Sequence, residues 1–146
     1  VIEADALRPN SAFSGNIYSK EYYALLLSRL RPGGFAATWC PTDRTRRTAS
    51  SVFPYSIVVD DLLLIGSDRP IVLDLDRTRR LLASEQVQAH FGKAGINIDS
   101  LLLPTLERIT PLTVDQQEDI NTDLFPRDEF YLPYTWELIK GKLLGK

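Results

Sequence analysis

The sequence predicts an α/β fold, and three successive patterns indicate it. A short apolar run at residues 1–4 leads through a polar loop into a stretch with helical spacing of apolar residues. A Pro-Gly-Gly turn ends that helix, and the apolar run at residues 35–40 predicts a second strand, which completes a βαβ unit. Two further apolar runs, separated only by Asp60-Asp61, predict an antiparallel pair of strands.

The first strand is expected at residues 1–4, which are apolar apart from Glu3. Residues 8–18 are rich in Pro, Asn, Ser and Gly and predict a loop. Ser19 is placed to cap the following helix, and Glu21 in its first turn is favoured by the helix dipole. The predicted buried face of this helix consists of Tyr23, Leu26, Leu27 and Leu30.

The second strand has apolar side chains at both odd and even positions, which is typical of a strand covered on both faces. After it, Thr42 is expected to cap a short helix that Pro54 closes. The small side chains of this helix form its predicted buried face: Thr45, Thr48, Ala49 and Val52. Its three arginines, Arg44, Arg46 and Arg47, are expected to point into solvent rather than to clamp a phosphate.

Residues 55–59 and 62–65 predict the antiparallel pair, and short helices are expected after residue 74. Ser84 or Asp99 is a candidate cap for these helices, and Thr113 with Gln116 is a candidate capping box. Aromatic and proline residues gather in the last stretch, which predicts an ordered tail lying over an apolar surface.

Composition limits the possible functions. The 146 residues suffice for one domain, and a net charge of -2 offers no broad attraction for nucleic acid. Cys40 is the single cysteine and His90 the single histidine, which excludes an internal disulfide and argues against a structural zinc site. No apolar run reaches the roughly 20 residues that span a bilayer, so we expect no membrane segment in this chain and a cytoplasmic location. Because the chain begins at Val1 within a predicted strand, we expect it to be a fragment.

Four motifs resemble those of spermidine synthases. Residues 5–9, DALRP, resemble the D-x-x-D-P segment that follows the fourth strand of these enzymes. Residues 16–23 resemble the helix start that comes next, and residues 30–35 match the L-x-P-G-G turn common to the fold. Residues 121–130 resemble the N-T-D…P…E-F/Y signature of spermidine-synthase-like domains that are often fused to a membrane region.

The resemblance implies the carboxyl-terminal half of a Rossmann-like, methyltransferase-type fold, whose full strand order is 3-2-1-4-5-7-6. Residues 1–73 would then form the contiguous strands 4-5-7-6, with the last pair antiparallel, and residues 74–146 a helical extension and ordered tail of the same domain. The missing amino-terminal half would hold the glycine-rich loop, so the cofactor-binding residues are unknown here. The open edge of the strand at residues 1–6 predicts a homodimer through that edge.

The same resemblance implies a reaction at Asp5. Spermidine synthases transfer an aminopropyl group from decarboxylated S-adenosylmethionine to an amine, and the amine must lose a proton because its pKa is near 10. An aspartate at a strand end can hold the ammonium group and accept that proton, so Asp5 is the candidate catalytic residue. The alternative is an aspartate that only caps the loop by bonding backbone amides.

Arg8, Asn16 and Tyr18 are the candidate substrate-binding residues. Arg8 stands where polyamine synthases have a second acid, and at about 4 Å it would repel an ammonium group by about 1 kcal/mol in water and about 4 kcal/mol at a dielectric constant near 20. An anionic or neutral acceptor is therefore easier to accommodate than putrescine. The alternatives are that Arg8 points into solvent and that Asn16 and Tyr18 serve turn formation and packing.

Three functions remain open. The parent protein is expected to be a spermidine-synthase-like transferase that uses S-adenosylmethionine or decarboxylated S-adenosylmethionine, with this fragment inactive by itself and without cofactor. The second is a catalytically silent interaction or regulatory domain, and the third an S-adenosylmethionine-dependent methyltransferase. His90 has no matching serine or cysteine motif and is expected to be a surface or half-buried residue.

Overall fold

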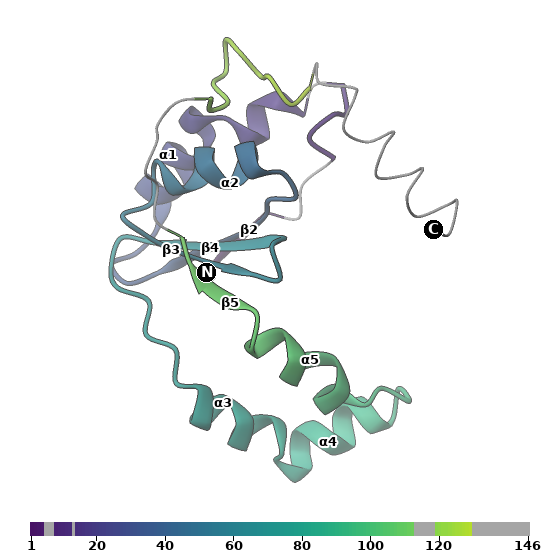
Figure 1. Ribbon diagram of the computed structural model, residues 1–146. Helices are drawn as coiled ribbons and strands as arrows, with labels where there is room; N and C mark the ends of the chain where they lie inside the picture. The colour runs from purple at the N-terminus through teal and green to yellow at the C-terminus, as the bar shows by residue number, and fades with distance from the viewer. Residues whose placement is uncertain (5–7, 13, 113–118, 130–146) are drawn as a thin grey trace, which may run out of the picture.

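The computed structural model describes residues 1–4, 8–12, 14–112 and 119–129, and it is an α/β structure built on one mixed sheet (Figure 1). The strands are β1 (Ile2–Ala4), β2 (Phe35–Trp39), β3 (Tyr55–Val59), β4 (Leu63–Ser67) and β5 (Ile109–Pro111). Their order in the sheet is β1-β2-β4-β3-β5. β1 runs parallel to β2, whereas β4 is antiparallel to both of its neighbours and β5 is antiparallel to β3.

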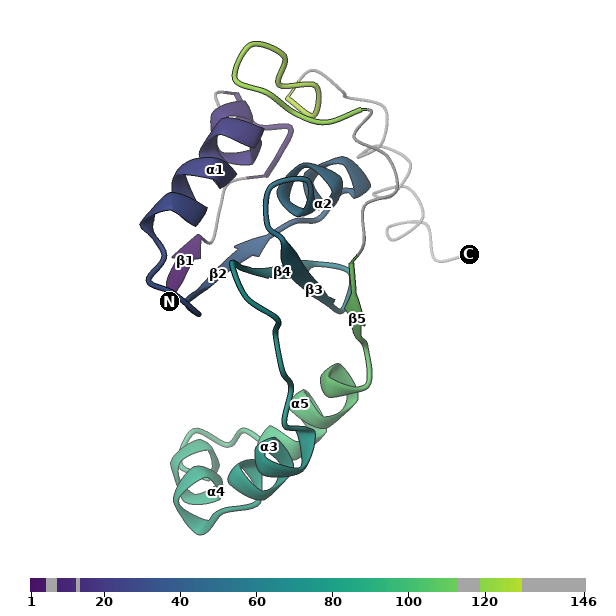
Figure 2. The same ribbon diagram turned by 90° about the vertical axis from the view of Figure 1, so that its left-hand side faces the viewer.

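Helices α1 (Lys20–Arg29) and α2 (Asp43–Ser50) cover one face of this sheet (Figures 1 and 2). Both helices begin at the predicted caps: the side chain of Ser19 accepts the N–H of Tyr22, and Thr42 forms a capping box with Thr45. Each cap satisfies a donor that the first turn of a helix leaves free. The core between helices and sheet consists of Tyr18, Tyr23, Leu26, Ala36, Cys40, Ala49, Phe53, Val58 and Leu64.

The turn between β3 and β4 explains how two adjacent strands reverse direction in so few residues. Asp60 and Asp61 both have positive φ angles, 56° and 55°, and the N–H of Leu62 donates to the C=O of Val59. Aspartate tolerates this conformation better than most residues, which makes the pair suitable for a tight hairpin. Leu62 is an extra residue in the ladder, since Val59 pairs with Leu63.

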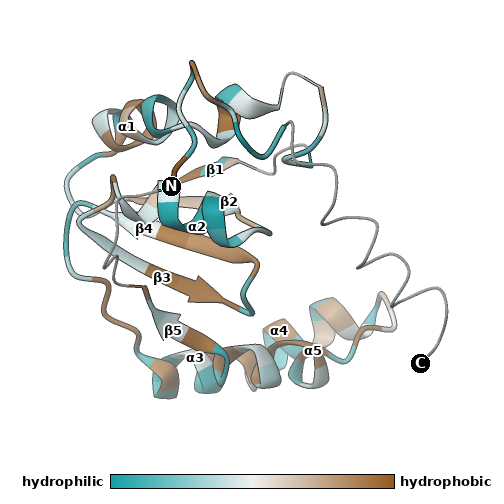
Figure 3. Cartoon of the chain, turned by 45° about the horizontal axis from the view of Figure 1, so that its top comes forward, coloured by the Kyte–Doolittle hydropathy of each residue, from teal (hydrophilic) through white to brown (hydrophobic). Residues whose placement is uncertain are grey.

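The opposite face of the sheet is only partly covered by the described residues, which corrects the expectation that the second strand, β2, is covered on both faces. Residues 57–59 of β3 and 63–65 of β4 are strongly hydrophobic (Figure 3). Phe35, Tyr55 and Leu63 on this opposite face are 38%, 44% and 37% exposed, whereas Ile57 at its centre is 6% exposed. Burial of this face is therefore incomplete at its rim.

Residues 74–106 form three short helices, α3 (Leu75–Leu82), α4 (Glu85–Gly92) and α5 (Ile98–Leu106), which we call the helical arm. The arm lies on the side of the sheet away from α1 and α2, and β5 leads back from it to the sheet (Figures 1 and 2). Ser84 stands at the N-cap position of α4, but its hydroxyl donates to the C=O of Leu81 and makes no capping hydrogen bond, and Asn97 rather than Asp99 caps α5. β5 was not expected, and the candidate capping box at Thr113 and Gln116 lies outside the described residues.

The sequence-based expectation of an α/β fold is confirmed, as is the antiparallel pairing of β3 with β4. Within the described part of the chain, none of the helices combines the length and apolar character needed to cross a membrane.

Candidate functional site at the carboxyl ends of β1 and β2

The loop that follows β1 is held together by its own serine. Ser14 is fully buried, and its hydroxyl lies 2.7 Å from the C=O of Pro9 and 2.7 Å from the C=O of Ser11. Directly after it, residues Gly15–Tyr18 form the 3-10 helix η1, and the C=O of Asn16 accepts hydrogen bonds from both the N–H and the hydroxyl of Ser19. Within the described residues 8–12 and 14–18, the loop is therefore tied to itself and to the start of α1.

Residues 119–129, which we call the C-terminal strap, lie against this loop and the two helices (Figures 1 and 2). The N–H of Gly15 donates to a carboxylate oxygen of Glu129 at 3.1 Å, and the N–H of Lys20 donates to the C=O of Asn121 at 2.9 Å. The N–H of Asn121 donates to the hydroxyl of Thr48 at 2.9 Å. The strap therefore joins the loop, α1 and α2 at the sheet end where open α/β sheets bind ligands.

Gly15 is required at its position because the strap passes so close to it. A Cβ atom there would lie 2.1 Å from Cβ of Pro126 and 2.7 Å from a carboxylate oxygen of Glu129. Such distances are below any tolerated contact, so a side chain would force the strap away from the loop.

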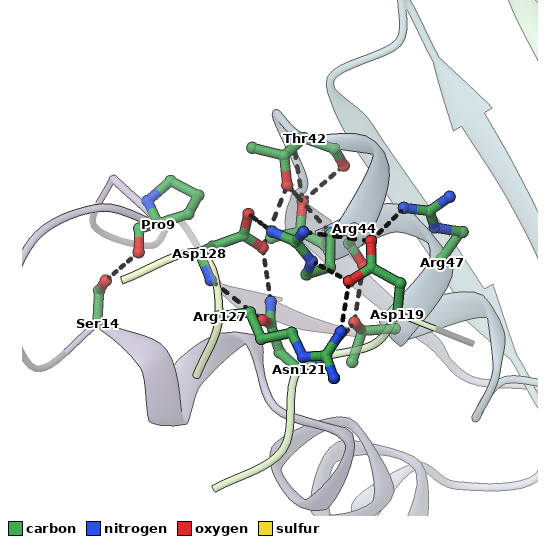
Figure 4. Close-up of polar contacts among 11 residues, drawn as sticks. Pro9, Ser14, Thr42, Arg44, Arg47, Asp119, Asn121, Arg127 and Asp128 are labelled. Carbon is green, nitrogen blue, oxygen red and sulfur yellow. Dashed lines mark hydrogen bonds and ion pairs between the residues drawn. The ribbon is translucent and has the colours of Figure 1, made fainter. Parts of the chain in front are cut away.

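An ion cluster holds the strap to α2 (Figure 4). The guanidinium of Arg44 bonds one carboxylate oxygen of Asp119 through Nε at 2.9 Å, and a carboxylate oxygen of Asp128 through Nη1 at 2.9 Å. Asp119 also accepts from Arg47 at 3.1 Å and from Arg127 at 2.9 Å. The expectation that all three arginines of α2 point into solvent is wrong for Arg44 and for Arg46, whose side chains are each 16% exposed; Arg46 donates to the C=O groups of Cys40 and Asp61.

The charges in this cluster shift each other's pKa. The hydrogen bond from Arg44 is the largest influence on Asp119, and with the charges of Arg44 and Arg47 it holds the pKa of that carboxyl below its usual value against the opposing effect of burial. Burial would lower the pKa of Arg44, but its bonds to Asp119 and Asp128 outweigh that effect and raise it. Both shifts favour the charged forms of Arg44 and Asp119 at neutral pH.

Asn121 takes part both in the hydrogen bonds within the strap and in the contact of the strap with α1 and α2. Its side chain is 1% exposed, and Nδ2 donates to Asp128 at 2.7 Å while Oδ1 accepts the N–H of Asp128 at 3.3 Å. Thr122 and Phe125 bond each other's backbone in a tight turn, and the N–H of Asp123 donates to Glu21 of α1. The strap is thus held both by hydrogen bonds within residues 119–129 and by a hydrogen bond to α1.

The four predicted site residues fall into three different situations. Asp5 lies outside the described residues, so its role stays a prediction. Arg8 and Asn16 are exposed on the loop after β1, which leaves their side chains accessible to a ligand. Tyr18 is fully buried within the core beneath α1 and α2.

The neighbouring thiol has the wrong protonation state for a nucleophile. Cys40 is fully buried, its Sγ lies 3.4 Å from the hydroxyl of Tyr23, and burial is the main cause that raises the pKa of the thiol to about 11. Burial likewise raises the pKa of Tyr23 well above its ordinary value. Both groups are neutral at physiological pH and belong to the core.

Sequence reasoning missed Arg44, Asp119 and Asp128. The N-T-D…P…E-F/Y motif did single out Asn121 and Glu129, but nothing near Arg44 indicates partners 75 and 84 residues away. Among the described residues, no group of three or more histidine, cysteine, aspartate or glutamate side chains is arranged to hold a metal ion.

These features define an α/β protein with a five-stranded mixed sheet, whose strap bonds the loop after β1 and the two helices that cover the sheet. Comparison with family models, with curated proteins and with solved structures found no match for this chain.

Proposed function

We propose that this chain is the carboxyl-terminal half of a spermidine-synthase-like transferase domain with a Rossmann-like, methyltransferase-type fold. The observation that supports the proposal is the position of β4, which lies antiparallel between β2 and β3. The order β1-β2-β4-β3 has the neighbours and directions of strands 4-5-7-6 in that fold. β5 is then an addition beyond strand 6.

In this proposal, ligand chemistry takes place where the loop after β1, the start of α2 and the strap converge. Asp5, directly after β1, is the acid-base residue that holds the acceptor amine and takes its proton. Arg8 and Asn16 lie exposed on the adjoining loop, and Arg8 disfavours a dicationic acceptor such as putrescine. The fully buried Tyr18 supports the loop from below.

The cofactor would be S-adenosylmethionine or its decarboxylated form, bound largely by strands and a glycine-rich loop that this chain does not contain. By itself the chain is then inactive, and its partner is the amino-terminal half of the fold. β1 ends the sheet on one side, so its outer edge would pair either with that half or with the same edge of a second copy. The whole protein would act in the cytoplasm, with or without a fused membrane region.

A catalytically silent interaction domain is the second candidate. It is favoured by the burial of Tyr18, which removes one of the predicted substrate contacts, and by the positive charge of Arg8 at a site meant for an amine. An S-adenosylmethionine-dependent methyltransferase is the third, because the same sheet order serves that chemistry.

Calorimetry separates these functions. The chain alone and the chain combined with an amino-terminal half would each be titrated with S-adenosylmethionine, decarboxylated S-adenosylmethionine and methylthioadenosine. We expect heat only from the combined protein, and aminopropyl transfer that is lost in Asp5→Asn while methylthioadenosine still binds. The absence of binding of all three ligands to the combined protein would reject both enzymatic functions in favour of the silent domain.

A further inference from the structure

The helical arm buries very little apolar surface of its own. Leu82 and Ile98 are its only buried apolar side chains in residues 74–106, all of which the structure describes. Large apolar side chains in and directly before the arm remain from one third to almost fully exposed: Val72 (87%), Leu73 (45%), Leu81 (62%), Ile96 (42%), Leu101 (60%) and Leu103 (36%). So many exposed apolar residues in a short segment are typical of an interaction surface.

The arm also has no covalent or metal support. Units shorter than about 40 residues generally need a disulfide, a metal ion or association to be stable. The only cysteine, Cys40, is buried in the sheet domain, and His90 is the only histidine. With a disulfide and a metal site excluded in this way, association with another chain is the remaining way to stabilise the arm.

The distribution of charge favours a second copy as the partner. α3 carries three basic residues, Arg77, Arg79 and Arg80, against one acid, Asp76. The first turns of α4 and α5 carry the acids Glu85 and Asp99. Two arms packed about a two-fold axis can therefore place the basic helix of each copy beside acidic helix ends of the other.

We propose that the helical arm is a self-association surface. Helices α3 and α5 of one copy pack against α3 and α5 of a second copy, and this contact covers Leu81, Leu101 and Leu103. Helices of eight and nine residues give each arm a footprint about 12 Å long and roughly 20 Å wide. Such a contact belongs to the small, weak class of interfaces, which predicts a micromolar dimer. The proposal is independent of the proposed function and of whatever covers the edge of β1.

Sedimentation equilibrium and a cysteine cross-link test this proposal. We expect the chain to associate over roughly 1–200 µM, and Leu101→Lys or Leu81→Lys to weaken the dimer at least about tenfold, since each buries a charge in the interface. The matched control is Leu25→Lys, which changes a leucine that is 51% exposed on α1. Leu101→Cys should give a disulfide-linked dimer under mild oxidation, whereas Leu25→Cys should not, and the buried Cys40 does not interfere.

Three outcomes overturn the proposal. One is a monomer at every concentration with arm amides protected from hydrogen exchange, which would mean that other residues of the same chain cover the arm. Another is a monomer whose arm exchanges freely. The third is a dimer that Leu101→Lys leaves intact while Glu3→Pro abolishes it, which would place the contact at the edge of β1.

Discussion

Replacing Arg44 by alanine is expected to release the C-terminal strap from α2. The side chain of Arg44 bonds both Asp119 and Asp128 and is 16% exposed, whereas Arg47 of α2 bonds Asp119. Asp128, with a side chain 10% exposed, would lose its cationic partner but keep the donors on Asn121 and Thr42. The variant therefore leaves a buried carboxylate only partly satisfied.

The magnitude lies between two limits. Removing one partner of a fully buried ion pair costs about 3–5 kcal/mol, whereas an exposed pair contributes about 0–1 kcal/mol. Because Asp128 retains two hydrogen-bond donors and Asp119 retains Arg47 and Arg127, we expect the free energy of unfolding to fall by about 2 kcal/mol.

Urea denaturation measures this change, and hydrogen exchange reports where it acts. The matched control is Arg69→Ala, since Arg69 is 64% exposed and lies 4.0 Å from its neighbour Asp68. We expect the control to change stability by less than about 0.5 kcal/mol and Arg44→Ala to raise amide exchange in residues 119–129 first. Equal effects of the two substitutions would refute the reasoning, because Arg44 would then act as an ordinary surface charge.

Three further predictions concern Asp119 of the strap and two positions in the core. The pKa of Asp119 is depressed in the folded state. The ionised carboxylate therefore adds to the free energy of unfolding above the ordinary aspartate pKa of about 4, and this contribution is lost as the pH falls through the lower folded pKa. The difference in free energy of unfolding between the wild type and Asp119→Asn should be constant near neutral pH and shrink below about pH 4. Cys40, buried and with its pKa raised to about 11, should react with a thiol reagent at neutral pH far more slowly in the native than in the unfolded chain, and equal rates would contradict its burial. Gly66→Ala should cost about 2 kcal/mol or more by urea denaturation, because its Cβ would lie 2.3–2.7 Å from three ring atoms of Phe53, whereas Gly92→Ala, with nothing within 4 Å, should not destabilise the chain.

Local patterns predicted the sheet domain well because its signals lie close together in the sequence. Ser19 and Thr42 cap their helices through donors three residues away, and Tyr23 and Leu26 lie on the buried face of α1 that their spacing predicted. Asp60 and Asp61 adopt the positive φ angles that a short hairpin needs. In each case the physical cause acts within a few residues.

The remaining features depend on contacts between distant residues. Arg44 and Arg47 look like part of a solvated helix face until the strap supplies a carboxylate from more than 70 residues away. β5 has only three residues, one of them proline, and becomes a strand because β3 offers a free edge beside it. Tyr18 looked suited to a substrate pocket, but the fold places it at the centre of the core.

The position of β4 between β2 and β3 is the central claim, since the proposed function depends on it. Backbone NOEs in an isotope-labelled sample measure it directly. We expect interstrand NOEs between Ala36 and Gly66 and between Ile57 and Ile65, together with parallel contacts from Glu3 to Ala37. Direct NOEs between the backbones of β2 and β3, with none from β2 to β4, would contradict the sheet order and remove the support for a methyltransferase-type fold.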